Sequence, residues 1–163
     1  MKLSLFLTVL FISTILQIAF FSQFTILGAK YEMLFALTIF ISLRYNWYEG
    51  AICGIWCGLF NDIFSLGSLG VGSFIYGISG FIAAISKNFI FTQHISIKLM
   101  ILFIMSFISS ILYIIFIQGI DIIFDLWTIY KLKITSIALI NTFFSAIFYK
   151  ILNNITKSDG LQN

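Results

Sequence analysis

Proline is absent from this sequence of 163 residues, which has one histidine, two cysteines and only 9% charged residues. A chain without proline suits continuous helices better than the turn-rich hairpins of a barrel. One histidine and two cysteines do not make a metal-binding set, so we predict no metal and no other cofactor. The nine basic residues are scattered singly and cannot follow a phosphate backbone, so we predict no nucleic-acid partner.

Apolar residues dominate what is present. They make up 61% of the chain, with 20 phenylalanines among them, and the mean hydropathy is +1.10. A water-facing surface cannot be assembled from this composition, so the sequence predicts an all-α integral membrane protein. We predict a single transmembrane helical domain, residues 1–152, followed by a polar cytoplasmic tail, residues 153–163.

Polar residues divide the apolar sequence into segments. Because about 20 helical residues cross about 30 Å of hydrocarbon, we predict a bundle of about six transmembrane helices at residues 3–27, 33–43, 51–64, 69–85, 97–117 and 134–152. The second and third helices are expected to be short, since Arg44, Asn46 and Glu49 interrupt them. A re-entrant hairpin or two tilted spans are alternatives for this pair, and four or five true spans stay open.

Basic residues indicate the orientation of the spans, because they favour the cytoplasmic side. With a cytoplasmic N-terminus, six basic residues fall inside and three outside: Lys2, Arg44, Lys87, Lys98, Lys150 and Lys157 inside, and Lys30, Lys131 and Lys133 outside. Both termini are therefore predicted to be cytoplasmic. The first segment has no small-x-small cleavage site and is interpreted as a retained span. Residues 119–133, which include Asp121 and Asp125, are predicted to lie along the outer interface.

Glycine is concentrated in one part of the chain: eight of the eleven glycines fall between Gly50 and Gly80. Gly50, Gly54 and Gly58 recur every fourth residue, so they form one ridge of a helix, with Asp62 next on the same ridge. Small residues let membrane helices approach closely. We expect the ridge to pack against a neighbouring helix of the same chain, with a ligand cavity or a partner helix as alternatives. A turn is predicted at Gly67, Gly70 and Gly72.

The acidic residues at the two ends of this helix do not form a catalytic pair. Glu49 and Asp62 are thirteen residues apart in the sequence, which on a helix is about 20 Å, beyond the roughly 5 to 10 Å of cooperating carboxylates. Asp62 is either a functional site, as acidic residues at membrane depth often are, or an interfacial carboxylate that ends a helix, paired with Asn61 or a serine of the following turn. A proton relay is disfavoured, because a relay needs a series of such groups.

The remaining polar residues have structural explanations. We expect interhelical hydrogen bonds from the mid-membrane side chains Gln17, Ser106, Ser109, Ser110 and Asn141. Cys53 and Cys57 lie four apart on one helix, which disfavours a mutual disulfide, so they are interpreted as packing residues. Metalloprotease, nucleophile-elbow and phosphate-loop motifs are absent from the sequence, and we therefore predict that the protein is not an enzyme.

Residues 31–84 carry an ordered set of features. Arg44 forms a basic turn, Glu49-Gly50 opens a glycine-ridged helix that ends in Leu59-x-x-Asp62, and a Ser-x-Gly-x-Leu-Gly turn at residues 65–70 leads to a further helix with Gly80. This order resembles the rod shape-determining protein MreD family. Tyr31-Glu32 stands where that family usually has proline followed by Asp or Asn, and Glu32 keeps an acidic group at the start of the second helix. The resemblance covers about a third of the chain.

The resemblance implies a multi-pass component of the bacterial inner membrane that acts in cell elongation. Its implied role is a non-enzymatic scaffold for MreC, for MreB (directly or indirectly), and for the peptidoglycan synthase made of a RodA-type polymerase and a class B penicillin-binding protein. It implies a packing role for Gly50, Gly54, Gly58, Gly70 and Gly80, whereas Glu32, Glu49 and Asp62 are candidate partner or pocket contacts. The alternative is a substrate-binding subunit of an energy-coupling-factor vitamin transporter, a similar six-helix protein; the alanine ridge common in the first helix of those subunits is absent here.

Overall fold

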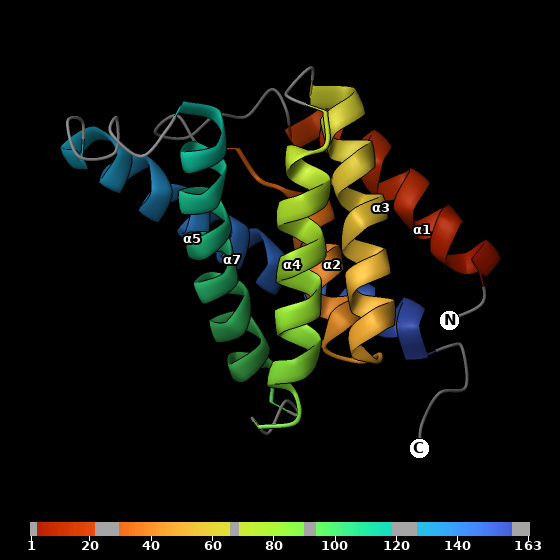
Figure 1. Cartoon of the computed structure of the whole chain (residues 1–163). Helices are drawn as coiled ribbons and strands as arrows, with labels where there is room; N and C mark the ends of the chain where they lie inside the picture. The colour runs from red at the N-terminus through yellow and green to blue at the C-terminus, as the bar shows by residue number, and fades with distance from the viewer. Residues whose placement is uncertain (1–2, 22–29, 66–68, 90–93, 119–126, 158–163) are drawn as a thin grey trace.

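The computed structural model describes residues 3–21, 30–65, 69–89, 94–118 and 127–157. Over these residues the chain is all-helical and contains no strand, which confirms the predicted fold class at that level. The order of elements is α1 Leu3–Leu16, the π-helix η1 Gln17–Phe21, α2 Met33–Ser42, α3 Trp47–Ser65, α4 Val71–Ser86, α5 Ile95–Gln118 and α7 Trp127–Lys157 (Figure 1).

The third helix is not short, and that prediction was wrong. α3 has 19 residues, about 28 Å at 1.5 Å per residue, and begins at Trp47 instead of residue 51. The backbone N–H of Asn46 donates a 3.1 Å hydrogen bond to Oε2 of Glu49, and the N–H of Gly50 donates to the carbonyl of Asn46. This is one half of a capping box, in which a residue in the first turn satisfies a donor just before the helix. Asn46 and Glu49 therefore start the helix that they were expected to interrupt.

The last helix is also longer than predicted. α7 covers 31 residues where hydropathy indicated residues 134–152, because polar residues such as Lys131 extend a helix beyond its apolar part. Residues 127–133 of the predicted interfacial segment belong to its first turns, while residues 119–126 lie outside the described residues. Residues 153–157 of the predicted tail are helical, and residues 158–163 lie outside the described part.

Helix α2 lies in the centre of the bundle. All ten of its residues are buried, as expected for a helix that is apolar on every face. α3 and α4 form the closest helix pair, α5 packs against α7, and α2 contacts α3 and α4 (Figure 1). Consecutive helices alternate in direction: α3 ends and α4 begins at one end of the bundle, whereas α4 ends and α5 begins at the other.

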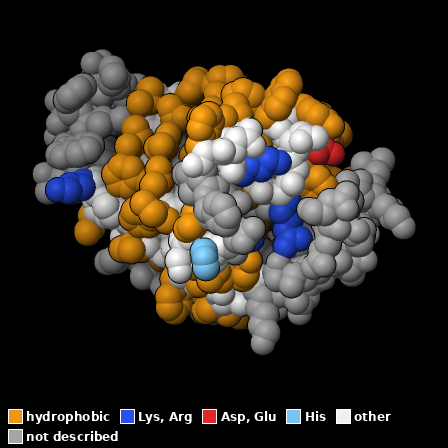
Figure 2. All heavy atoms as spheres, turned by 90° about the horizontal axis from the view of Figure 1, so that it is seen from below, with side chains coloured by type: hydrophobic (Ala, Val, Ile, Leu, Met, Phe, Trp, Pro, Cys, Tyr) orange, Lys and Arg blue, Asp and Glu red, His pale blue; other side chains and the backbone are white. Residues whose placement is uncertain are grey.

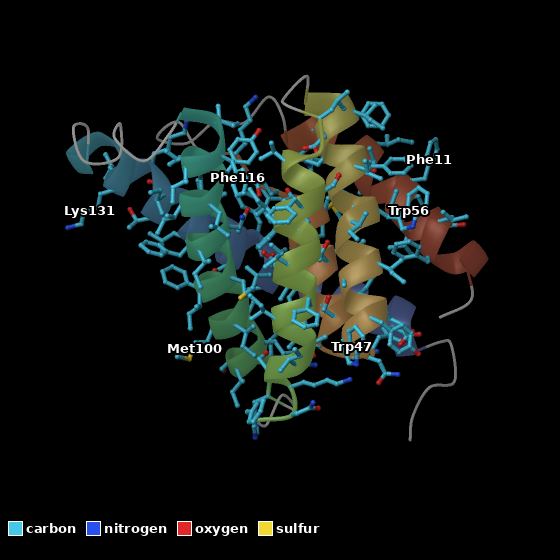
Figure 3. All side chains as sticks on the ribbon, viewed as in Figure 1. Phe11, Trp47, Trp56, Met100, Phe116 and Lys131 are labelled. Carbon is cyan, nitrogen blue, oxygen red and sulfur yellow. The ribbon has the colours of Figure 1, made fainter. Side chains whose placement is uncertain are left out.

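Two stretches of the described chain are long and apolar enough to cross a membrane: residues Ile95–Ile117 of α5 and Lys131–Tyr149 of α7. Large apolar side chains are exposed on several helices, including Phe11 on α1, Trp56 on α3 and Met100 on α5, all of which point away from the bundle (Figure 3). The end view in Figure 2 shows hydrophobic side chains around the periphery. Contiguous apolar surface of this kind marks a face that contacts protein or lipid instead of water.

Candidate functional site

The glycine ridge of α3 lies directly against the backbone of α4. A Cβ atom placed on Gly54 would lie 2.6 Å from the carbonyl carbon of Tyr76, and one placed on Gly58 would lie 2.5 Å from Cα of Ser73. Both distances are shorter than the 3.0 Å that real Cβ atoms keep from other heavy atoms. A bare ridge is therefore required for this approach, as it is in closely packed membrane helices. Helix α4 of the same chain occupies this face, as expected. The alternatives were a ligand cavity or a partner helix.

Three helices meet at the other end of the ridge. A Cβ atom on Gly50 would lie 2.8 Å from the carbonyl oxygen of Gly80 and 2.9 Å from Oγ of Ser42. Gly80 approaches the carbonyl oxygen of Gly50 in return. These two glycines therefore fix the distance between α3 and α4 where both helices contact the end of α2.

Asp62 holds the beginning of α4. Its Oδ2 accepts a 2.8 Å hydrogen bond from the N–H of Gly70 and a 3.2 Å bond from that of Ser73, and its Oδ1 accepts a 3.1 Å bond from Gly72. The side chain is 1% exposed. The first N–H groups of a helix lack partners within that helix, and a carboxylate also suits the positive end of the helix dipole. Asp62 thus supplies the cap that Gly70 cannot supply.

Two glycines shape the turn around this carboxylate. Gly70 adopts a φ of +96°, in the left-handed region that side chains other than glycine rarely adopt. Any Cβ on Gly72 would collide with Oδ1 of Asp62. Gly67, the third glycine of the predicted turn, lies outside the described residues. The glycines and the carboxylate therefore form one structural unit, which we call the α3–α4 clasp: Gly50, Gly54, Gly58, Asp62, Gly70, Gly72 and Gly80.

Glu32 lies apart from the clasp, just before α2. Its Oε2 accepts a 3.2 Å hydrogen bond from the hydroxyl of Tyr76, and its backbone N–H donates a 2.9 Å bond to Oδ1 of Asn141. Asn141 in turn donates to Oγ of Ser106 at 2.7 Å. The start of α2 is therefore tied to α4, α5 and α7. Glu49 and Asp62 are not brought together, because they are at opposite ends of α3 and each has its own backbone partners.

The interhelical bonds predicted for Gln17 and Asn141 are confirmed. Nε2 of Gln17 donates to Oδ1 of Asn61 at 2.8 Å, and its Oε1 accepts from the N–H of Leu34 at 2.9 Å. The prediction was wrong for Ser109 and Ser110, whose hydroxyls donate to the carbonyl of Ser106 within α5. Serine hydroxyls commonly make such bonds within a helix when no partner faces them.

A cavity of about 530 Å³ lies next to Glu32, within the usual size range of ligand sites. η1, the start of α2, the C-terminal parts of α3 and α5 and the N-terminal parts of α4 and α7 all contribute to its wall. Its polar lining includes Gln17, Asn61, Tyr76 and Tyr113, together with three charged side chains, Lys30, Glu32 and Lys133. The cavity therefore concentrates polar groups in an otherwise apolar bundle.

Sequence reasoning missed most residues of this cavity. Lys30 and Lys133 were used only to predict the orientation of the spans, and Tyr76 and Tyr113 were not singled out. Residues that are 103 positions apart, such as Lys30 and Lys133, carry no local pattern that links them. The available signal was a polar residue within an apolar segment. This signal identified Gln17, which lines the cavity.

The two thiols of Cys53 and Cys57 are buried and free, as their interpretation as packing residues requires. In the described part of the chain, no group of three His, Cys, Asp or Glu side chains is placed to hold a metal ion. In comparisons with known proteins, no protein-family model, curated protein sequence or solved structure matches the chain.

Proposed function

We propose that the protein is a multi-pass component of the bacterial inner membrane, with about six spans and both termini in the cytoplasm. The exposed apolar side chains on α1, α3, α5 and α7 support contact with lipid. Basic residues gather at one end of the bundle: Arg44 lies between α2 and α3, and Lys87 and Lys98 flank the connection from α4 to α5. These basic residues support a cytoplasmic location for this end, which is seen in Figure 2.

Within that membrane, the function we propose is a non-enzymatic scaffold of the cell-elongation machinery, as the resemblance to the MreD family implies. One observation carries the choice of a scaffold over a catalyst. Asp62 and most glycines of the family-like pattern belong to the α3–α4 clasp, and both oxygens of Asp62 accept hydrogen bonds from backbone N–H groups. A carboxylate held in this way has a structural role and is not available to a reactant.

The partners we propose are MreC, MreB (directly or indirectly), the RodA-type polymerase and the class B penicillin-binding protein. The closely packed α3–α4 pair supports such a role, because both helices carry exposed apolar side chains that a membrane-anchored partner can cover, among them Ile52 and Ile63 on α3 and Phe74 on α4. Each helix therefore offers apolar surface on which a partner helix can pack.

Affinity capture tests the scaffold. A tagged protein extracted in mild detergent should recover MreC and the wall synthase from a rod-shaped host, and its depletion should make the cells round. A variant with Ile52, Ile63 and Phe74 replaced by alanine should fold but recover less MreC, whereas alanine at the exposed Met100 of α5 should have no effect. Normal cell shape after depletion, together with failure to recover either partner, would falsify the proposal.

A substrate-binding subunit of a vitamin transporter is the second candidate, and the cavity beside Glu32 is the observation that favours it. Its volume of about 530 Å³ accommodates a vitamin-sized molecule, and its lining has the mixed polar and apolar character of ligand sites. Co-purification of a vitamin, together with uptake that requires the energising subunits, would decide for this candidate. Rod-shape loss without any uptake defect would decide for the scaffold.

A further inference from the structure

Two lysines and one glutamate meet at the cavity from different parts of the chain. Lys30 precedes α2 and Lys133 lies in the first turns of α7, and both side chains are exposed, whereas Glu32 is partly buried. No ion pair joins these three residues within the described part of the chain. The lysines therefore place positive charge at the open part of the cavity, and the glutamate places an acceptor further inside.

Several polar groups of the lining have hydrogen-bonding capacity that the described residues do not use. Glu32 accepts the Tyr76 hydroxyl through Oε2, and its Oε1 has no partner in the described part of the chain. The hydroxyl of Tyr113 forms no hydrogen bond with a described residue, and Asn61 uses its oxygen for Gln17 while its NH₂ group is unused. Polar groups in partly buried positions are normally satisfied, so a polar occupant is expected.

The arrangement of the charged side chains indicates which class of ligand the cavity can bind. Two ammonium groups suit a phosphate, which offers several oxygens to separate donors. The open oxygen of Glu32 suits a hydroxyl or amine of the same molecule. Apolar side chains such as Ile18, Phe64 and Ile137 complete the wall and suit a hydrocarbon portion. The alternative is a cavity that holds only water, which would show no preference among ligands.

We propose that this cavity binds a phosphate ester that also carries a hydroxyl or amine donor, with the phosphate at Lys30 and Lys133 and the donor at Glu32. Such a group occurs in the headgroup of a membrane lipid and in soluble phosphate esters. The site is independent of the proposed partners, because its polar residues are distinct from the exposed apolar side chains of α3 and α4.

Competition between two lipids tests the binding. Phosphatidylethanolamine has a phosphodiester and an ammonium group that can donate, whereas phosphatidylcholine has the same phosphodiester and the same net charge without a donor. Native mass spectrometry of the full chain, with both lipids present at equal concentration, should show phosphatidylethanolamine retained about tenfold more than phosphatidylcholine. Calorimetry with glycerol 3-phosphate tests whether the cavity binds a soluble phosphate ester. Retention of the lipid alone identifies a bilayer ligand, and binding of glycerol 3-phosphate alone identifies a soluble one.

The lysines provide a matched control, because Lys131 is exposed on the same helix as Lys133, does not line the cavity and points away from the bundle (Figure 3). The double variant Lys30→Gln/Lys133→Gln should retain about tenfold less of either lipid than the wild type, because both lipids carry the phosphate, and Lys131→Gln should retain as much as the wild type. Glu32→Gln should lower the preference for the donor-bearing lipid without abolishing retention of phosphate.

Three outcomes would overturn the site. In the first, the wild type retains the two lipids equally and does not bind glycerol 3-phosphate. In the second, Lys131→Gln has an effect as large as that of the double variant. In the third, no probe binds at millimolar concentration. If the double variant does not fold, each single lysine variant is measured, and unchanged retention of the lipids by both variants overturns the site as well. Recovery of MreC by the double variant is measured separately and reports on the scaffold alone.

Discussion

Replacement of Gly54 by alanine is expected to destabilise the protein, although alanine is the better helix former. The intrinsic gain of alanine over glycine inside a helix is about 1 kcal/mol. Against it, the new Cβ would lie 2.6 Å from the carbonyl carbon of Tyr76 and 2.9 Å from Cα of Gly77, where ordinary contact begins at 3.4 Å. Both neighbours are backbone atoms, so no side chain can move aside, and α3 and α4 must separate by at least about 0.8 Å.

The steric cost should exceed the propensity gain. Overpacking a close interface typically costs about 1 to 3 kcal/mol, and a separation of the helices also lengthens the three bonds from α4 to Asp62, which are now 2.8 to 3.2 Å long. We therefore expect a net loss of about 1 to 2 kcal/mol, which for a protein of this size lowers the melting temperature by about 2 to 8 °C. Replacing Gly54 by leucine should prevent folding.

Thermal unfolding in a mild detergent, followed by the fluorescence of the three tryptophans, measures the effect. The control is Ile52→Ala on the same helix, because Ile52 is 53% exposed and its truncation should change stability by less than about 0.5 kcal/mol. If Gly54→Ala melted at the wild-type temperature or above it, α3 and α4 would not be in backbone contact and the reasoning would be refuted.

Three further predictions concern single polar groups. Asp62→Asn should cost about 1 to 2 kcal/mol and weaken amide protection at the start of α4, because the charge at the helix N-terminus is lost; wild-type hydrogen exchange there would contradict the capping role. Asn141→Ala should cost about 1 kcal/mol through two lost interhelical bonds, and an unchanged melting temperature would show that they contribute nothing. In intact cells, an impermeant maleimide should label a Lys131→Cys variant but not the buried Cys53 or Cys57 of the wild type; failure to label position 131 would place it on the cytoplasmic side.

The close packing of the α3 ridge against a neighbouring helix could be predicted because glycine spacing along a helix is a local property of the sequence. Gly50, Gly54 and Gly58 recur with the period of a helix turn, and close approach of helices requires such a bare ridge. The partner of the ridge could not be derived in the same way. Nothing in the sequence shows that Gly77 and Gly80, instead of another apolar helix, face it.

Helix ends were less predictable than helix centres. Hydropathy places the middle of a span, but hydrogen bonds to backbone groups decide where the helix begins. Asn46 and Glu49 are polar and therefore indicated an interruption, whereas their positions three residues apart are typical of a helix start. α7 extends through Lys131 for a related reason, since a helix does not end where its apolar face ends.

Of the three acidic residues singled out from the family-like pattern, Asp62 and Glu32 have different surroundings in the structure. Both oxygens of Asp62 accept bonds from the backbone of α4, so its substitution changes folding before it changes anything else. Glu32 has one oxygen bonded to Tyr76, and it lines a cavity together with Lys30 and Lys133. Substitution of Glu32 can therefore remove ligand chemistry while the clasp stays intact. If the scaffold has a ligand-dependent step, Glu32→Gln is the variant that separates that step from stability, and Asp62→Asn cannot.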